Sequence, residues 1–278
     1  MALTKLEIKK EELYLDGQTF GSVGPYKQLD GVAYFSVDPN EDINSKIVDI
    51  DLAPVGPDGL VRFSSHFSIL QPTDLTKSNR RILLDICNRG NRTVFNNFNS
   101  AGPALDPSKP LEPGNGFLLR QGYTIVWCGW QADVPELDGL IGMQAPQAVK
   151  SGKEIRDKVM NWFQVNETTT RHVLSHSEHM PYTAAYKHEE SAVLYSRNHP
   201  NQPLDVIDRS SWTFGSAENS NADTDLTYIH MENGFQPGKI YQLVYTAVGS
   251  RIVGLGFAAI RDFISFLKYS LQENGNPL

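Results

Sequence analysis

The sequence has 278 residues, 40% hydrophobic and 10% aromatic, so it can bury a sizeable core and is neither disordered nor a small disulfide-stabilised fold. Its net charge of −7 and the absence of a basic stripe argue against nucleic acid as a partner. The N-terminus shows no apolar signal-peptide segment, and no apolar run approaches the roughly 18 residues of a membrane span. We therefore expect a cytoplasmic protein that binds no membrane.

Residues 1–80 are predicted to form a β-rich extension. Residues 31–37 and 60–70 are rich in β-branched and aromatic side chains and are bounded by Pro, Gly and Asp, which is typical of strands. We expect these two strands to be antiparallel. Residues 47–50 are a shorter strand candidate, and the turn-forming residues 53–59 would return the chain as a hairpin.

Residues 81–133 are predicted to begin an α/β sheet. Residues 82–87 and 123–128 are nearly continuous apolar runs, as expected for strands buried on both faces. A polar loop at 88–91 follows the first run, and a short helical segment at 116–121 precedes the second. The order strand, loop, helix, strand indicates a parallel crossover unit. Cys87 and Cys128 end the two apolar runs, so both are expected to be buried and reduced.

The rest of the chain is predicted to hold an irregular, mostly β insertion at 134–239, followed by a final segment at 240–278. Strand-like pieces in the insertion lie at 159–165, 191–195 and 212–214. In the final segment, residues 240–247 are predicted to form a strand. Residues 253–271 are predicted to form a helix, because apolar residues recur there with helical spacing. We expect the whole chain, 1–278, to form a single α/β region.

Six blocks occur in order along the chain: GSVGPY at 21–26, IVDIDLAP at 47–54, CNRGN at 87–91, GNGFLLRQGY at 114–123, VWCGW at 126–130 and GLGFAAIRD at 254–262. Together they resemble the large, mostly uncharacterised family of alpha/beta hydrolase domain proteins. The resemblance implies a partial α/β-hydrolase-like sheet with the β-rich extension and the β insertion described above. It also implies a serine esterase that acts on ester or related acyl bonds of a small molecule.

The serine nucleophile that the resemblance implies has no counterpart in this sequence. Ser22, Ser216 and Ser250 each lack glycine two residues away on both sides, so none forms the G-x-S-x-G elbow. Because that fold orders its triad as nucleophile, acid and histidine, the resemblance places all three beyond Leu278. We expect an N-terminal portion that is inactive alone and that self-associates or pairs with a complementing C-terminal half. The alternative is a non-enzymatic module that binds a ligand or a partner chain.

Two groups of residues are candidates for a binding site. The resemblance makes Asn88, Arg89 and Gly90 the oxyanion-hole candidates, while an ordinary turn closing a buried strand is the alternative. Arg89 could instead bind a substrate carboxylate or form a structural salt bridge. Trp127 and Trp130 are candidates to line an acyl pocket or to pack in the core.

Three histidines, His172, His176 and His179, have a spacing that could hold zinc beside Glu178. However, nothing in the sequence predicts a helix that would align them, and Pro181 interrupts the stretch. We therefore expect a polar surface connection, and the sequence predicts neither a bound metal nor a cofactor.

Two pairs of charged residues are further candidates. Asp49 and Asp51 share one face of the candidate strand, as paired carboxylates of a glycosidase would, but no second acidic cluster opposes them. A solvated strand edge is the preferred interpretation. Arg261 and Asp262 are expected to form either the polar face of the last helix or an ion pair.

Overall fold

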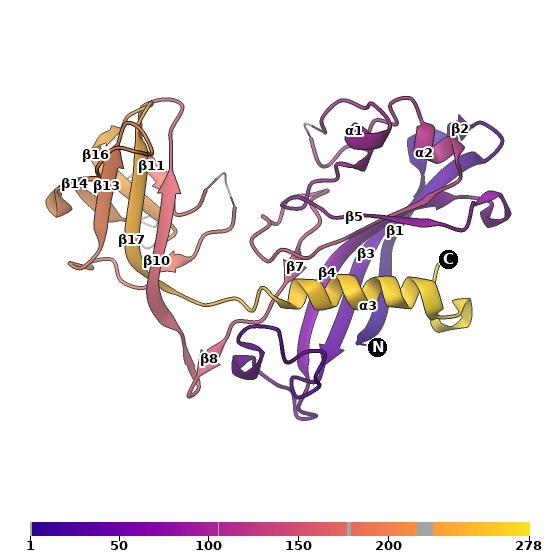
Figure 1. Ribbon diagram of the computed structural model, residues 1–278, viewed down its shortest axis with the longest axis horizontal. Coiled ribbons are helices and arrows are strands. Elements are labelled where there is room, and N and C mark those ends of the chain that lie inside the picture. The colour runs from indigo at the N-terminus through magenta and orange to yellow at the C-terminus, as the bar shows by residue number, and fades with distance from the viewer. Residues whose placement is uncertain (1, 105, 177–178, 216–224) are drawn as a thin grey trace. The chain divides into compact units, whose positions relative to one another are not determined.

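The computed structural model describes residues 2–104, 106–176, 179–215 and 225–278. Strands predominate, and the chain divides into two compact units (Figure 1). Unit 1 comprises Met1–Pro146 and Arg251–Leu278, and unit 2 comprises Gln147–Ser250. Within the described residues, no helix is long and apolar enough to cross a membrane.

Unit 1 is built on one sheet whose strands lie in the order β1, β3, β4, β6, β5. Neighbouring strands are antiparallel except β6 and β5, which pair in parallel with Asp85 opposite Trp127. The main strands are β1 (Leu3–Leu13), β3 (Gly24–Val37), β4 (Val61–Pro72), β5 (Ile82–Asp85) and β6 (Thr124–Cys128); the short strands β2 (Thr19–Phe20) and β7 (Met143–Gln144) pair with β3 and β4.

Both faces of this sheet are covered. The helix α3 (Leu255–Tyr269) lies across the sheet in Figure 1, and its Phe263 ring contacts the Phe67 ring of β4, with centroids 5.3 Å apart. Strand side chains adjacent in sequence to those that face α3 point to the other face of the sheet. There they form a core with residues of α1 (Val94–Phe98) and α2 (Phe117–Arg120). This core includes Tyr14, Tyr26, Leu70, Phe95, Leu119 and Trp127.

The predicted α/β fold with a partial α/β-hydrolase-like sheet is wrong. The structure is mostly β, with several antiparallel sheets, and β5–β6 is the single parallel pair among the described strands. The crossover unit between those two strands is confirmed, but it does not extend into a parallel sheet. A continuous apolar run shows that both faces of a strand are buried, but it does not show that the strand lies in a parallel sheet. In this protein α3 covers one face of a mainly antiparallel sheet, and the core described above covers the other.

The predicted strand at 47–50 is also wrong. Residues 41–53 form successive turns, with N–H groups of Asn44, Ile47 and Ile50 each bonded to the carbonyl three residues earlier. Asp49 adopts a left-handed conformation with φ of 61°, which ends any extended path. Asn and Asp side chains compete with regular backbone pairing, so this acidic, Asn-containing stretch forms turns despite its apolar residues.

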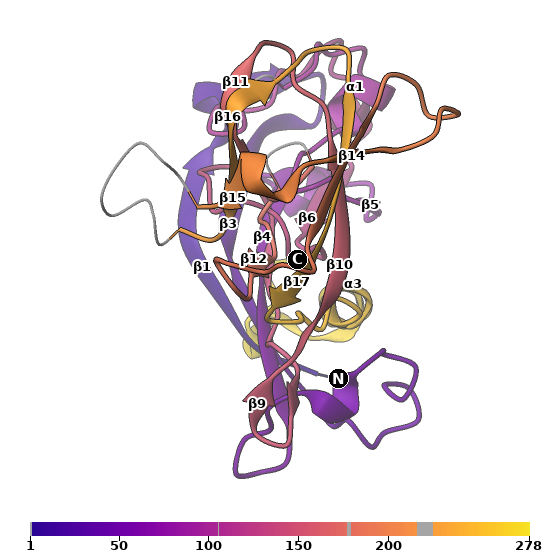
Figure 2. The ribbon, with the colours of Figure 1, turned by 90° about the vertical axis from the view of Figure 1, so that its left-hand side faces the viewer.

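Unit 2 consists mainly of two sheets (Figure 2). They pack on a shared aromatic core. The first has the order β10 (Arg156–Phe163), β17 (Ile240–Val248), β13 (Val193–Arg197), β14 (Asp205–Ile207), with β12 (Thr183–Ala184) also on β17. The second has the order β11 (Thr169–Val173), β16 (Tyr228–Phe235), β15 (Trp212–Phe214); β8 (Val149–Lys150) and β9 (Lys153–Glu154) form a separate ribbon. The strand pieces predicted in residues 159–247 are therefore confirmed, but they form regular sheets instead of an irregular insertion.

Short 3-10 helices connect several of these elements. They lie at Tyr14–Gly17, Ile50–Leu52, Leu75–Lys77, Arg209–Ser211 and Gln272–Asn274. At the edge of the unit 1 sheet, β5 pairs with β6 alone among the described strands. An open edge can pair with another chain, so the self-association predicted from the sequence stays a prediction.

The two cysteine thiols are expected to be unreactive in the folded protein. Cys87 and Cys128 are free and buried, as the sequence predicted. Burial raises the pKa of the Cys87 thiol to about 12, assisted by the charge of Asp85, and burial also raises the pKa of Cys128. At pH 8 only about one Cys87 thiol in 10,000 would be ionised, and the thiolate is the reactive form. Titration with a disulfide reagent should detect both thiols only after denaturant is added; rapid reaction of either one would contradict this.

Candidate functional site

The loops that follow β5 and β6 lie together, because parallel strands end at the same edge of a sheet. The Arg89 N–H donates to Oε1 of Gln131 at 2.7 Å, and the Ile141 N–H donates to the Gly90 carbonyl at 3.1 Å. These bonds tie the loop after β5 to residues 131–141. The two loops form one wall of unit 1.

The predicted oxyanion residues form a tight turn within this wall. Asn88 and Asn91 exchange backbone hydrogen bonds at 3.2 and 3.1 Å, and the Arg89 N–H is already bonded to Gln131. Gly90 has a φ of +83°, and an added Cβ would lie 2.7 Å from Val134 Cγ1. Of the N–H groups at 88–90, that of Gly90 alone has no partner among the described residues. The turn thus connects the two loops and retains little donor capacity for an oxyanion.

Trp127 and Asp85 form a partly buried contact beside this turn. Oδ2 of Asp85 accepts hydrogen bonds from Trp127 Nε1 at 2.7 Å and from the Thr93 and Val94 N–H groups at 2.8 and 2.9 Å. The carboxylate therefore holds the start of α1 against the core, where Trp127 is 1% exposed. Of its two alternatives, pocket lining or core packing, the structure places Trp127 in the core.

Trp130 has a different environment. Its Nε1 donates to the Cys87 carbonyl at 2.7 Å, and its ring lies 5.9 Å from that of Phe257 on α3. It is half-buried and connects the end of β6 to the end of β5. Neither tryptophan borders either of the two cavities that flank Arg92.

Arg92 lies between two cavities of unit 1. One has a volume of about 520 Å³ and is bordered by residues of β1, β3 and β4, including Phe67, and by the loop containing Ile141. The other, of about 240 Å³, is bordered by Phe95 and by residues of the segments 101–104 and 106–112. Arg92 and Lys109 border both. The candidate site is this pair of cavities with the two cations at their junction.

The Arg92 guanidinium has no carboxylate partner within ion-pair distance among the described residues. Its Nη2 donates to the Pro107 carbonyl at 3.0 Å, and its charge lies 5.9 Å from the Trp127 ring. Burial lowers its pKa, and the charge of Asp30 acts in the opposite direction. A half-buried cation that is held in place but not neutralised is suited to bind an anion.

The position of the Pro107 carbonyl depends on Gly139. Gly139 has a φ of +80°, and a Cβ at this position would lie only 1.7 Å from the Pro107 oxygen. A side chain at 139 would therefore displace the loop that holds Arg92. Glycine is required here because the two loops approach this closely.

Arg89 and Arg261, which the sequence analysis singled out, are both paired. Arg89 forms an ion pair with Asp133, as one of the two alternatives expected. Arg261 pairs with Asp262 at 2.7 Å and also bonds to Asn44, so it links α3 to the turns at 41–47. Both cations have structural partners, in contrast to Arg92.

The remaining sequence candidates do not join the cavities around Arg92. Asp49 and Asp51 are exposed on turns, Ser22 is exposed on a turn, and the half-buried Ser250 belongs to unit 2. Ser216 lies outside the described residues.

The histidines predicted as a zinc alternative lie in unit 2. His172 and His176 border a groove there, and the rings of His176 and His179 are 6.3 Å apart. Glu178 lies outside the described residues. Within the part of the chain that the structure describes, no three His, Cys, Asp or Glu side chains are arranged to hold a metal ion.

The residues that distinguish this site, Arg92 and Lys109, were missed in the sequence analysis. Arg92 directly follows the polar loop at the end of a predicted buried strand, so its location was available as a signal. Its lack of a carboxylate partner could not be predicted from the sequence, because Arg89, only three residues away, does form an ion pair.

Comparison of the chain with models of protein families, with curated proteins and with solved structures finds no match.

Proposed function

We propose that unit 1 binds a small anionic organic molecule, with a carboxylate at Arg92 and an apolar part in the larger cavity. The observation that carries this proposal is the unpaired Arg92 guanidinium at the junction of the two cavities. Arginine binds carboxylates through two parallel hydrogen bonds, and Lys109 supplies a second positive charge. The volume of about 520 Å³ falls within the range of roughly 300–1,000 Å³ typical of small-molecule sites.

The composition of the larger cavity supports an amphipathic ligand. Phe67, Leu140 and Ile141 contribute apolar surface, whereas Lys10 is neutralised by Glu12 at 2.7 Å and Asp30 accepts two bonds from Gln28. The charge of Lys10 is thus neutralised within the protein and the Asp30 carboxylate is hydrogen-bonded, whereas Arg92 is left to fix the orientation of a ligand.

This proposal takes up the binding-module alternative of the sequence analysis, and we place the protein in the cytoplasm, consistent with its two free cysteines. The esterase activity that the resemblance implies for a longer protein stays a prediction. Among the described residues, no hydrogen bond joins the hydroxyl of Ser22 or Ser250 to a histidine ring, as an activated nucleophile would have.

The test uses 1-naphthoate, which combines a carboxylate with a compact apolar part, and its uncharged methyl ester. Calorimetric titration should detect naphthoate binding and much weaker binding of the ester. Arg92→Gln should weaken naphthoate binding about tenfold to a hundredfold, because a hydrogen bond to a charged group contributes about 1.5–3 kcal/mol. Lys109→Gln should have a smaller effect.

Arg62→Gln is the matched control, since Arg62 is exposed, pairs with Asp58 and does not border either cavity. It should bind naphthoate like the wild type. Thermal unfolding of each variant separates lost binding from lost folding. Equal affinity for the acid and the ester, or unchanged binding by a folded Arg92→Gln variant, would refute the proposal.

A further inference from the structure

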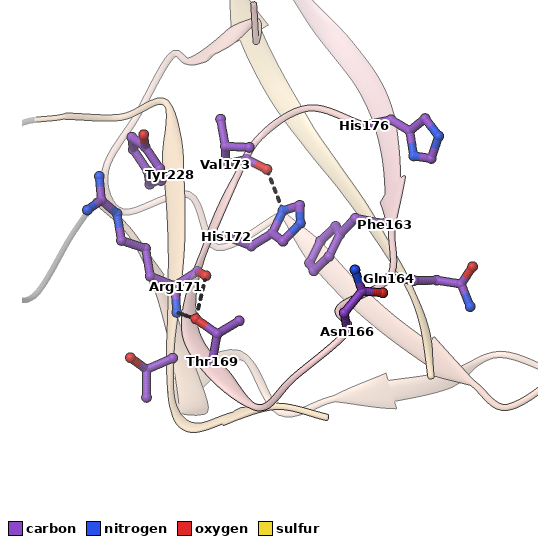
Figure 3. A pocket seen from close by; sticks show the side chains of 10 residues that line it. Phe163, Gln164, Asn166, Thr169, Arg171, His172, Val173, His176 and Tyr228 are labelled. Atoms are coloured by element: carbon purple, nitrogen blue, oxygen red, sulfur yellow. Dashed lines mark hydrogen bonds between the residues drawn. The ribbon is translucent and has the colours of Figure 1, made fainter. Parts of the chain in front are cut away.

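Unit 2 contains a second, independent recess of about 880 Å³ between the end of β10 and the strand β11 (Figure 3). β10 and β11 are each at the edge of their sheet, so this groove lies on an open side of the unit. Its described lining includes no acidic residue, although the chain as a whole is acidic. The lining residues are Phe163, Gln164, Asn166, Thr169, Thr170, Arg171, His172, Val173, His176 and Tyr228.

The cation of this groove, Arg171, is fixed in place without being neutralised. Its guanidinium carbon lies 3.6 Å from the centre of the Tyr228 ring, a cation–π contact that restricts its orientation. Its buried Nε has no hydrogen-bond partner, and no carboxylate pairs with it among the described residues. An anionic group that reaches the terminal nitrogens would satisfy this charge.

On the other side of β11, His172 is stacked on Phe163, with ring centroids 4.0 Å apart and planes inclined by 14° (Figure 3). Its Nδ1 lies 2.7 Å from the Val173 carbonyl, so Nδ1 carries the proton and Nε2 is left as an acceptor in the neutral ring. Burial lowers the pKa of His172. Arg171 is therefore the main source of positive charge at neutral pH.

Side chains of β11 form hydrogen bonds with most of the backbone groups on the exposed edge of this strand. Oγ1 of Thr169 accepts from the Arg171 N–H at 3.3 Å and donates to the Arg171 carbonyl at 3.0 Å, and His172 occupies the Val173 carbonyl. The Leu174 N–H donates to the carbonyl of Thr227, which directly precedes β16, so the backbone groups of Leu174 face β16. Because backbone groups alternate in direction along a strand, those of residues 171 and 173 face away from β16. Of the outward backbone groups of residues 171 and 173 that an added peptide strand would need, all but the Val173 N–H are already bonded, which favours recognition of a ligand by side chains.

We infer that this groove binds an acidic saccharide, with a sugar carboxylate at Arg171. Gln164, Asn166 and Thr170 present amide and hydroxyl groups that both donate and accept hydrogen bonds, as sugar hydroxyls do. An open groove with this polar lining offers little to an apolar ligand. The charge of Arg171 selects an anionic sugar over a neutral one.

The experiment titrates the full chain with oligogalacturonate, using an uncharged malto-oligosaccharide, polyglutamate and polyadenylate as comparisons. Oligogalacturonate should bind at least tenfold more tightly than each of the others, and its affinity should fall with added salt. Arg171→Met should reduce its affinity about tenfold or more while keeping an unbranched side chain against Tyr228. Asn166→Ala should reduce affinity severalfold.

Arg197→Gln is the matched control, because Arg197 is on β13, has a buried Nε without a partner like Arg171, and does not border the groove. Oligogalacturonate should also shift the NMR signals of the His172 and His176 rings. Equal binding of the neutral saccharide, tighter binding of polyglutamate or polyadenylate, no binding of oligogalacturonate, or unchanged affinity in a folded Arg171→Met variant would each overturn the inference. Because Arg92 and Arg171 belong to different units, each variant tests one site.

Discussion

Replacement of Glu189 by glutamine is expected to destabilise unit 2 by about 3 kcal/mol at neutral pH. The Glu189 side chain is 7% exposed and accepts hydrogen bonds from Lys158 of β10, from Ser191 and from both the hydroxyl and the N–H of Thr246 on β17. An amide would put N–H donors against these donors and leave the Lys158 charge unpaired. Unfolding in urea, followed by hydrogen exchange of the Thr246 amide, measures the loss.

The same residue predicts an acid-dependent loss of stability. Burial alone would raise the pKa of Glu189, but the hydrogen bonds from Lys158, Thr246 and Ser191 outweigh it and lower the pKa from 4.5 to about 2. A carboxyl whose pKa is lower in the folded protein stabilises it above the unfolded value. This contribution of about 3 kcal/mol is therefore complete above pH 4.5 and is lost as the pH falls toward 2.

Glu190→Gln provides the control, since Glu190 is exposed and adjacent in sequence. It should change the unfolding free energy by less than about 0.5 kcal/mol. The wild type should lose more stability than Glu189→Gln between pH 4.5 and 2. Parallel pH profiles of these two proteins would show that the Glu189 contacts do not contribute as argued.

Replacement of Asp85 by alanine is expected to destabilise unit 1 by about 3 kcal/mol and to weaken naphthoate binding. The change leaves Trp127 Nε1 and the Val94 N–H without the acceptor they share. Both donors belong to buried residues, so water does not easily replace the lost bonds. Because α1 begins directly after Thr93, its release also frees the backbone that carries Arg92.

Asp85→Asn should have a smaller effect, since the amide oxygen can still accept part of these bonds. Asp58→Asn is the exposed control, and its stability should stay close to that of the wild type. Urea unfolding monitored by tryptophan fluorescence gives the free energies, and calorimetry gives the binding. Wild-type stability in Asp85→Ala would contradict the role assigned to this carboxylate.

The sequence by itself determined the elements with a strong local pattern. The helical spacing of apolar residues at 253–271 predicted α3, and the apolar runs at 82–87 and 123–128 predicted β5 and β6. The loop and the helical segment between these two runs predicted their parallel pairing. Runs of β-branched and aromatic side chains bounded by turn residues predicted β3 and β4, which pair antiparallel as expected. These predictions succeed because side-chain periodicity reports which face of an element is buried.

Tertiary structure decided the fold class and the unpaired charges. Apolar runs do not encode strand direction, so the sequence did not show that β4 pairs antiparallel with β6. Likewise, Arg89 and Arg92 are alike in sequence, yet residue 133, brought in by the loop after β6, neutralises the first and leaves the second beside a cavity. Charge pairing depends on distances between segments far apart in the chain, and local residue patterns do not contain those distances.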